Sequence, residues 1–475
     1  MAESTLQVRL PLRTIALAGA AALLGGCATF SADGGFDSVR SAAQERLGKE
    51  VRWHRSDEDV AAARTEMQRL LAKPLSADDA VQIALSNNRG LQATYAELGI
   101  AEADVVQAGR LTNPHFSYMR VSHGDERKLE WALTFPIIDL VTMPLRTRIE
   151  ARRFEEVQLA VAGATVSLAL DARRAWYEAV AAEETARYME QVKRAAEASA
   201  DLARRMARAG NFPRLTQMRE QVFYAEVTAQ LARAKQTAAS QRERLARLMG
   251  LPNAEFNLPE RLPDLPNAPA DAGEVAAKGA EHRYDIQSAR RMTEALAQAL
   301  GLSKVTRFVS ALEFGPAGVR EDPEPWKRGF EVSVQIPLFD WGGARVAKAE
   351  ALYMQAVHRL AQTAIDAQSE MRDTYAAYRT AYDTARHYRD EIVPLRKKIS
   401  EENVLRYNGM LISVFELLAD AREQVASVNA AIEALREYWI AETELQAALN
   451  GAPLGRSAAS RTASARMPSA ASGGH

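Results

Sequence analysis

The chain has 475 residues, 47% of them hydrophobic and 25% charged, which is compatible with about two to four folded domains. Its 60 basic and 61 acidic residues nearly balance, which argues against nucleic acid as a partner. A single cysteine excludes an intramolecular disulfide framework.

The N-terminus has the pattern of an export signal. Arg9 and Arg13 precede an apolar run over residues 14–24, and two glycines separate this run from Cys27. A basic start, a short apolar stretch and small residues before the cleavage point are typical of a secretory signal peptide. No other stretch has about 18 consecutive apolar residues, so a membrane-spanning helix is not expected elsewhere.

Cys27 is the candidate for lipid attachment. Leu24-Gly25-Gly26-Cys27 resembles the lipobox of bacterial lipoproteins, in which the cysteine is acylated; the alternative is an ordinary signal followed by an incidental cysteine. Two or three acyl chains give stable anchoring where one does not. By the same resemblance, Ala28 in place of an aspartate favours the outer membrane. We expect residues 1–26 to be removed and residues 27–73 to form a lipid anchor with an extended linker.

The first of two predicted repeats covers residues 74–252. Its first helix is expected to begin after Ser76, because Ser76 and Asp79 are spaced as a capping box. The pair Asn87-Asn88 should interrupt this helix, which is expected to end near residues 109–113.

A β-hairpin and a helical hairpin complete this repeat. Residues 115–122 and 128–137 alternate in polarity around a glycine-containing turn, which predicts two strands. From about Pro144 to Ala209 the sequence favours one helix of about 65 residues, roughly 95 Å long at about 1.5 Å per residue. A second helix of about 36 residues, ending at Met249, should return alongside it.

The second repeat, residues 273–453, has the same order of elements. Residues 253–272 are rich in Pro, Asn and Asp and are expected to connect the repeats, and the tail over residues 454–475 is predicted to be disordered. Pro394 has no counterpart in the first repeat and should kink or restart its helix. The expected elements are a helix over 273–304, strands over 306–315 and 329–337, a long helix from 343 that turns at 407–409, and a return helix over 414–449.

The joint between strand and long helix is the clearest sign of duplication. Pro136 and Asp139 in the first repeat recur with the same spacing as Pro337 and Asp340, about 201 residues later. In both copies we expect the strand to stop at the proline and the helix to follow.

The expected strands have one apolar side. Phe330, Val332, Val334 and Ile336 alternate with polar residues, and this apolar side could either pack on protein or face lipid. The export signal favours a transmembrane barrel, for which several aromatic residues could lie at the membrane interfaces: Tyr118, Trp131, Phe135, Phe314 and Trp326. Four strands cannot close a barrel. Two copies would give eight strands and a filled interior, whereas three would give twelve and room for a pore.

The chain resembles an outer membrane factor of the TolC type, in the lipoprotein branch. The residues that carry the resemblance are 75–80 and 84–88 at the first helix, 336–343 at the second joint, and 406–409 with 416–422 near the second helical turn. The resemblance implies an α+β, mainly α fold: long antiparallel helical hairpins forming a periplasmic α-barrel, with four strands per protomer in a shared twelve-stranded barrel of a homotrimer. It also implies a periplasmic adaptor and an inner membrane pump as partners.

Candidate gate residues lie at the helical turns. The resemblance implies that charged rings and inter-helix bonds hold the periplasmic entrance shut, and the alternative is a set of ordinary solvated charges. Glu416 and Asp420 are four residues apart and should share a helix face. Ser413-Val414-Phe415 stands where the family usually has an aspartate, so the register of the acidic ring stays open. The candidates are Arg208, Arg406, Tyr407, Gly409, Glu416 and Asp420.

The sequence does not predict an enzyme. Its seven histidines are scattered, none has metal-ligand spacing, and a phosphate-binding glycine loop is missing. We expect no cofactor apart from lipid on Cys27, and no metal. The expected function is a passive exit duct for drugs, solvents or metal ions, with a resistance-nodulation-division pump as one candidate partner. The alternatives are a type I secretion channel and a lipid-anchored periplasmic coiled-coil scaffold without a barrel.

Overall fold

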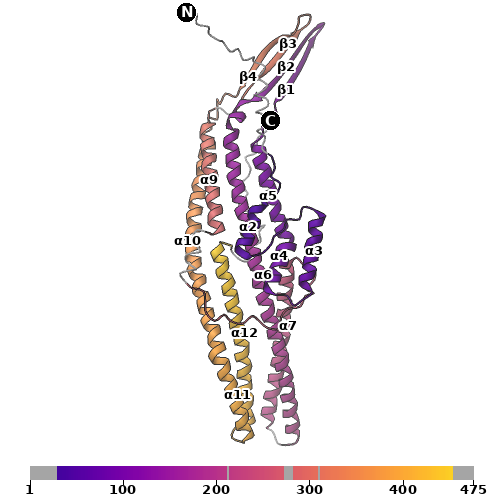
Figure 1. Ribbon diagram of the computed structural model, residues 1–475, viewed down its shortest axis with the longest axis vertical. Coiled ribbons are helices and arrows are strands. Elements are labelled where there is room, and N and C mark those ends of the chain that lie inside the picture. Colours follow the sequence, from indigo (N-terminus) through magenta and orange to yellow (C-terminus); the bar gives the residue numbers. More distant parts are fainter. Residues whose placement is uncertain (1–28, 211–212, 272–281, 309–310, 453–475) are drawn as a thin grey trace, which may run out of the picture. The chain divides into compact units, whose positions relative to one another are not determined.

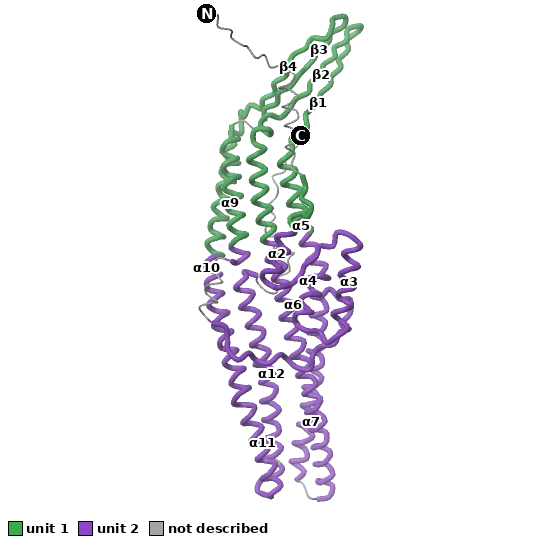
Figure 2. Tube along the Cα trace, in the orientation of Figure 1, with its two compact units in different colours: residues 1–36, 96–159, 287–363 green, residues 37–95, 160–286, 364–475 purple. Residues whose placement is uncertain are grey.

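The computed structural model describes residues 29–210, 213–271, 282–308 and 311–452 (Figure 1). The expected signal peptide, Cys27 and the tail over residues 454–475 lie outside this part of the chain. The described residues belong to two compact units, which are described separately (Figure 2). Unit 1 comprises residues up to 36, 96–159 and 287–363, and unit 2 comprises residues 37–95, 160–286 and those from 364 onward.

Helices dominate the fold, with four strands in one sheet (Figure 1). In chain order the elements are α2 (Phe36–Leu47), α3 (Asp57–Leu71), α4 (Ala77–Asn87), α5 (Arg89–Ala108), β1 (His115–His123), β2 (Glu126–Pro136), α6 (Ile137–Arg208), α7 (Arg214–Met249), α9 (Tyr284–Val305), β3 (Leu312–Glu321), β4 (Lys327–Val334), α10 (Gly343–His387), the π-helical turn η1 (Tyr388–Ile392), α11 (Val393–Asn408) and α12 (Val414–Asn450).

The N-terminal segment is not the extended linker that we expected. It contains α2 and α3, and α3 is started by a capping box in which Ser56 and Asp59 bond each other's backbone N–H groups. Only Ala63 and Leu70 of α3 are buried, so its apolar periodicity is too weak to predict a helix from the sequence.

The junction between α4 and α5 is confirmed as predicted. Ser76 and Asp79 form the capping box of α4, and the helix ends at Asn87. The side-chain amide of Asn87 donates to the carbonyls of Met249 (3.1 Å) and Gly250 (2.9 Å). These bonds satisfy carbonyls at the C-terminus of α7, where Gly250 has a φ of +70°. A Cβ on Gly250 would come within 2.7 Å of the Asn87 carbonyl oxygen, so this position requires glycine.

The second repeat makes the equivalent junction with different chemistry. Arg283, only 3% exposed, donates to the Ala448 carbonyl (2.6 Å) near the end of α12. The same guanidinium pairs with Asp285 at 2.8 Å and Glu370 at 2.7 Å. A buried arginine needs such partners, because an unpaired charge is expensive to remove from water. The two repeats therefore share their element order but use amides in one case and an ion-pair cluster in the other.

The sheet belongs to unit 1 and is antiparallel throughout, in the order β1-β2-β3-β4. The predicted first hairpin is confirmed, with His115 opposite Thr134 and a turn at Gly124. The third strand was predicted six residues too early, because β3 begins at Leu312 and continues through Pro316 to Glu321. Proline usually indicates a strand end, since it cannot donate a ladder hydrogen bond.

Two features accommodate Pro316 within the sheet. Pairing between β2 and β3 is interrupted there, since Ala132 pairs with Ala317 and Phe135 with Phe314 but no pair lies between them. A Cβ on the neighbouring Gly315 would come within 1.8 Å of a β2 carbonyl oxygen, so only glycine permits this close approach.

The long helices follow the predicted hairpins, with one shifted start. α6 begins at Ile137, about seven residues before the expected start, and contains Pro144 in its second turn. Pro144 removes one backbone bond near the helix start, and the helix continues on both sides. The predicted restart at Pro394 is confirmed, because η1 ends at Ile392 and Pro394 occupies the first turn of α11.

Candidate functional site

The strands place apolar and polar residues on opposite faces of the sheet. Residues directly opposite each other in an antiparallel pair share a face, and the register therefore extends the expected alternation of β4 to all four strands. One face is apolar or aromatic over most of its length: Phe116, Tyr118, Leu129, Trp131, Leu133, Phe135, Leu312, Phe314, Pro316, Phe330, Val332 and Val334.

The other face is polar, charged or small over most of its length, with Met119, Val121 and Val319 as the apolar exceptions. It carries Lys128, Glu130, Ala132, Thr134, Glu313, Ala317, Lys327, Gly329, Glu331 and Ser333.

The apolar face of the sheet is left exposed, which is unusual for a water-soluble sheet, and on β1 and β4 both faces are exposed. On β2 the polar face is covered, with Ala132 and Thr134 each 4% exposed, whereas Phe135 on the apolar face is 46% exposed. On β4 the apolar Phe330 is 72% exposed. The Thr134 hydroxyl donates to Glu313 at 2.8 Å, so the polar face also bonds across strands. An apolar face left in contact with water is unfavourable, which indicates that something other than water covers it.

Both outer strands of this sheet keep a free edge within the described chain. β1 pairs only with β2, and β4 pairs only with β3. Unpaired N–H and C=O groups along an edge are a template for a strand of another chain. The sheet is therefore suited to be continued on both sides.

The strand–helix joints differ more than the repeated spacing predicted. Pro136 ends β2 directly before α6, and Asp139 in the first helical turn accepts a bond from Thr112 (2.9 Å) and faces Arg146 (3.3 Å). Asp340 instead lies in a non-helical segment of residues 335–342, where its carboxylate accepts the Gly342 N–H (2.8 Å). Pro337 is in this segment, three residues beyond the end of β4.

The predicted gate residues in unit 2 do not form one cluster. Arg208 and Tyr407 are exposed. Arg406 bonds Glu402 of its own helix at 3.2 Å. Gly409 has an ordinary φ of −79°, and the left-handed residue of the turn is Met410, at +58°. A latch between Arg406 or Tyr407 and the acidic pair is therefore not formed within the described chain.

Glu416 and Asp420 have different environments despite their helical spacing. Glu416 is exposed, and its backbone N–H lies 3.4 Å from the Ser413 hydroxyl, which caps α12. Asp420 is only 8% exposed, and its Oδ2 has no hydrogen-bond partner among the described residues. Their shared spacing along the helix therefore does not give the two carboxylates the same environment.

A pair that the sequence did not reveal joins the two helical hairpins. Arg422 of α12 donates to Glu220 of α7 at 2.9 Å, and the Glu220 side chain is 5% exposed. Glu220 also accepts a bond from Ser199 of α6 (3.0 Å), and the Arg422 guanidinium lies 4.2 Å from the centre of the Phe223 ring. One ion pair and one stacked cation therefore connect α12 to the α6–α7 hairpin. The two partners are 202 residues apart, and no local motif marks them.

The contact between the hairpins changes character along α12. One and two heptads beyond Arg422 lie Asn429 and Arg436, and the Asn429 amide donates to the Met189 sulfur (3.5 Å). Towards the other end of the helix, Trp439 stacks on Tyr177 at 5.0 Å with a 16° angle between the rings. Nearer the turns the hairpins meet through the Arg422 ion pair and through Val425, which packs on apolar residues of α6 and α7, and farther from the turns aromatic rings pack between them.

The connector between the repeats is bound along its backbone by both hairpins. Three side chains donate hydrogen bonds to its carbonyl groups: Arg242 to Ala254 (2.8 Å), Trp439 to Pro263 (3.1 Å) and Tyr382 to Asn267 (2.9 Å). Its Leu262 N–H donates to Glu184 (3.1 Å), whose pKa is raised by burial. The sequence identified this segment only as a linker. The bonds that hold it use its backbone, and backbone groups leave no signal in the sequence.

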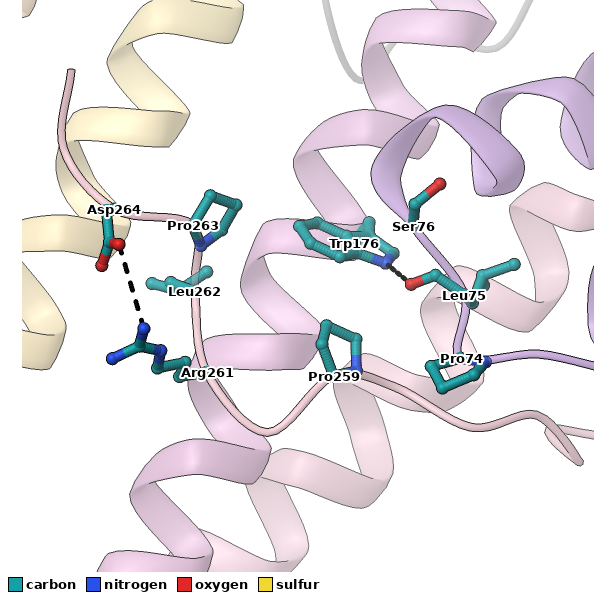
Figure 3. Close-up of a pocket in the computed structure, with 9 residues that line it drawn as sticks. All are labelled: Pro74, Leu75, Ser76, Trp176, Pro259, Arg261, Leu262, Pro263 and Asp264. Carbon is teal, nitrogen blue, oxygen red and sulfur yellow. Dashed lines mark hydrogen bonds and ion pairs between the residues drawn. The ribbon is translucent and has the colours of Figure 1, made fainter.

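An open cavity of ≈ 390 Å³ lies where the connector passes the start of α4 (Figure 3). Trp176 forms one wall, and its indole N–H donates to the Leu75 carbonyl at 2.8 Å. The remaining lining is largely proline and leucine: Pro74, Pro259, Leu262 and Pro263, with Ser76, Arg261 and Asp264. This lining has no nucleophile beside a base.

The described residues contain no group of three or more His, Cys, Asp or Glu side chains that could hold a metal ion. Within the same ranges, no helix is long and apolar enough to cross a membrane.

The sequence matches no protein-family model and no curated protein. The fold is similar to solved structures, among them a membrane protein from Pseudomonas aeruginosa, with 20% identity, 81% of this chain and 92% of that chain covered, and a TM-score of 0.67. The outer membrane protein VceC from Vibrio cholerae is 15% identical, with 79% of this chain and 97% of that chain covered and a TM-score of 0.66. The CmeC outer membrane channel from Campylobacter jejuni is 15% identical, with 90% of this chain and 94% of that chain covered and a TM-score of 0.64. The chain has the fold of these outer membrane proteins.

Proposed function

We propose that this chain is an outer membrane exit duct of the TolC type: a passive channel built by three copies, which works with a periplasmic adaptor and an inner membrane pump. The observation that carries the proposal is a sheet with an exposed apolar face, a polar face that is covered at Ala132 and Thr134, and two free edges. Lipid is the surrounding that makes such a face favourable, and a closed barrel is the only sheet that can span a bilayer.

The strand length supports a membrane-spanning role. β2 has 11 residues. At about 3.4 Å per residue and a tilt of about 40°, such a strand spans roughly 28 Å, close to the apolar band of about 25 Å in outer membrane barrels. Four strands per copy require further copies, and three copies give twelve strands with room for a pore.

The polar face would then line the pore, and the helical hairpins would contribute to a periplasmic tunnel. The fold does not discriminate between a drug, solvent or metal-ion exporter and a type I secretion channel, because these differ mainly in their partners. Single-channel recording on the purified oligomer in planar bilayers tests the proposal. Discrete conductance steps are expected, whereas a lipid-anchored scaffold without a barrel would give none and would show no heat-modifiable gel migration.

We propose that the Arg422–Glu220 pair helps to keep the entrance closed. It connects two hairpins that also meet near their turns through Val425, which packs against an apolar cluster of α6 and α7, and its carboxylate is buried. Separation of the hairpins there would break this pair and expose Val425, a smaller apolar surface than the aromatic contact farther along. The aromatic contact between Tyr177 and Trp439 would stay in place as the fixed point.

Lipid on Cys27 remains part of the proposal, supported by the lipobox-like sequence and by the absence of any other cysteine. Cys27→Ser should abolish incorporation of a radioactive fatty acid by the protein in growing cells. Channel formation should survive, because the barrel anchors the protein independently. Continued labelling of the serine variant would show that the lipid is attached to another residue.

A further inference from the structure

The segment between β4 and α10 exposes four large apolar side chains in succession. Ile336 is 70% exposed, Leu338 69%, Phe339 99% and Trp341 57%. The equivalent joint of the first repeat has no such segment, because α6 begins directly after β2. An exposed cluster of this kind marks a surface that contacts something other than water.

Specific bonds hold this segment in place. The Arg307 side chain donates through Nε to the Trp341 carbonyl at 3.2 Å, and Arg345 reaches the Thr306 carbonyl at 3.5 Å. Gly342 has a φ of +71°, and a Cβ there would come within 2.7 Å of the Arg307 carbonyl oxygen. The chain entering α10 is thus fastened to the chain leaving α9, and the rings are exposed by an ordered backbone.

Exposed cations lie on the two chain segments that form this joint. Lys304, Arg307, Arg345 and Lys348 are all exposed, and none of them forms an ion pair with a described residue. The nearby carboxylate of Asp340 accepts the Gly342 N–H. At the first joint, in contrast, Arg146 is matched by Asp139 at 3.3 Å. The second joint therefore combines aromatic rings with positive charge that the chain itself does not neutralise.

We propose that this second joint, residues 304–308 with 336–348, is a binding site for anionic phospholipid headgroups at the membrane surface on the helix side of the sheet. Phe339 and Trp341 would lie at the level of the glycerol groups, where aromatic side chains are favoured, and the guanidinium groups would bond the phosphate. The inference rests on the proposed barrel and adds a lipid preference to it.

Two observations favour lipid over a second copy of the chain as the occupant. Ile336, the first of the four exposed apolar side chains, continues the alternation of Val332 and Val334 on the apolar side of β4, so the cluster begins where that side ends. Four cations against the one carboxylate of Asp340 leave a net positive charge, which matches phosphate. A protein partner would have to supply carboxylates to the same place.

The experiment uses the full-length oligomer in detergent, titrated with phosphatidylglycerol or phosphatidylcholine and observed by native mass spectrometry. The wild type should bind phosphatidylglycerol preferentially. Arg307→Gln with Arg345→Gln should weaken that binding roughly thirtyfold, since each cation near an anionic surface contributes a factor of about five. The control is Arg233→Gln with Arg247→Gln, which removes two exposed arginines of α7 and should leave the preference unchanged.

A second measurement places the aromatic rings. The contribution of Trp341 to the fluorescence is the difference in emission between the wild type and Trp341→Phe. In vesicles that contain phosphatidylglycerol brominated near its headgroup, this contribution should be strongly quenched. An unchanged lipid preference in the double arginine variant would overturn the proposal. The double variant Phe339→Ser with Trp341→Ser would also overturn it if the oligomer dissociated while the lipid preference stayed unaltered. That result would identify the rings as a contact between copies. A wild type that forms no oligomer would instead contradict the proposed channel.

Discussion

Arginine in place of Val332 should prevent assembly of the barrel. Val332 is 53% exposed and lies opposite Phe314 on the apolar face. An arginine on a lipid-facing strand near the bilayer midplane costs about 2–4 kcal/mol per copy. Because each copy in a symmetric oligomer carries the change, the penalty is multiplied by the number of copies. The heat-modifiable oligomer should therefore disappear from the outer membrane fraction.

Ser333→Arg is the matched control for this substitution. Ser333 is the next residue of β4 and lies opposite Glu313 on the polar face. An arginine there would remain in a water-filled interior beside a carboxylate, and assembly should be close to normal. Equal loss of the oligomer in both variants would contradict the assignment of the two faces.

Replacement of Arg422 by methionine should open the entrance. The variant leaves Glu220 without its cation, and breaking a buried pair costs about 3–5 kcal/mol when both partners are buried. The cost here is smaller, because the Arg422 side chain is 38% exposed and solvent screens it. Single-channel conductance in planar bilayers should rise, and cells should become more permeable to large antibiotics.

Arg396 provides the control within the same unit. It pairs with Glu423 at 2.5 Å, joining α11 and α12 of one hairpin, whereas Arg422 joins two hairpins. Arg396→Met should leave conductance unchanged. Glu220→Arg combined with Arg422→Glu restores opposite charges and should return conductance towards the wild-type value. A closed channel in Arg422→Met, in a correctly assembled oligomer, would mean that the pair has only a structural role.

Elements with local signals were predictable from the sequence. Ser76 and Asp79 fixed the start of α4 through a capping box, and the glycine at 250 marked the end of α7. The alternation in β4 correctly separated its faces because strand side chains alternate with period two. Such signals operate within a few residues, and a single sequence contains them in full.

Features that depend on distant contacts were not predictable. Pro316 indicated a strand end, but the structure provides a pairing gap with β2 and a glycine, Gly315, directly before the proline, so β3 continues. Helical spacing made Glu416 and Asp420 equivalent, whereas packing in unit 2 covers only Asp420. Glu220 and Arg422 come together only through the fold. Sequence spacing alone therefore did not reveal the pair on which our proposal for the entrance rests.

The central claim is that free strand edges of neighbouring copies pair into one closed barrel. The most direct test is disulfide cross-linking between β1 and β4, with one cysteine at Tyr118 and a second, in turn, at Phe330, Val332 or Val334. All four positions lie on the apolar face of the sheet. Pairing of β1 from one copy with β4 from the next would bring Tyr118 close to one of the β4 positions. Oxidation in outer membrane fractions should produce, for at least one pair, a covalent ladder that ends at three copies. A ladder that ends at two copies, or no cross-link for any pair in an assembled channel, would contradict the account.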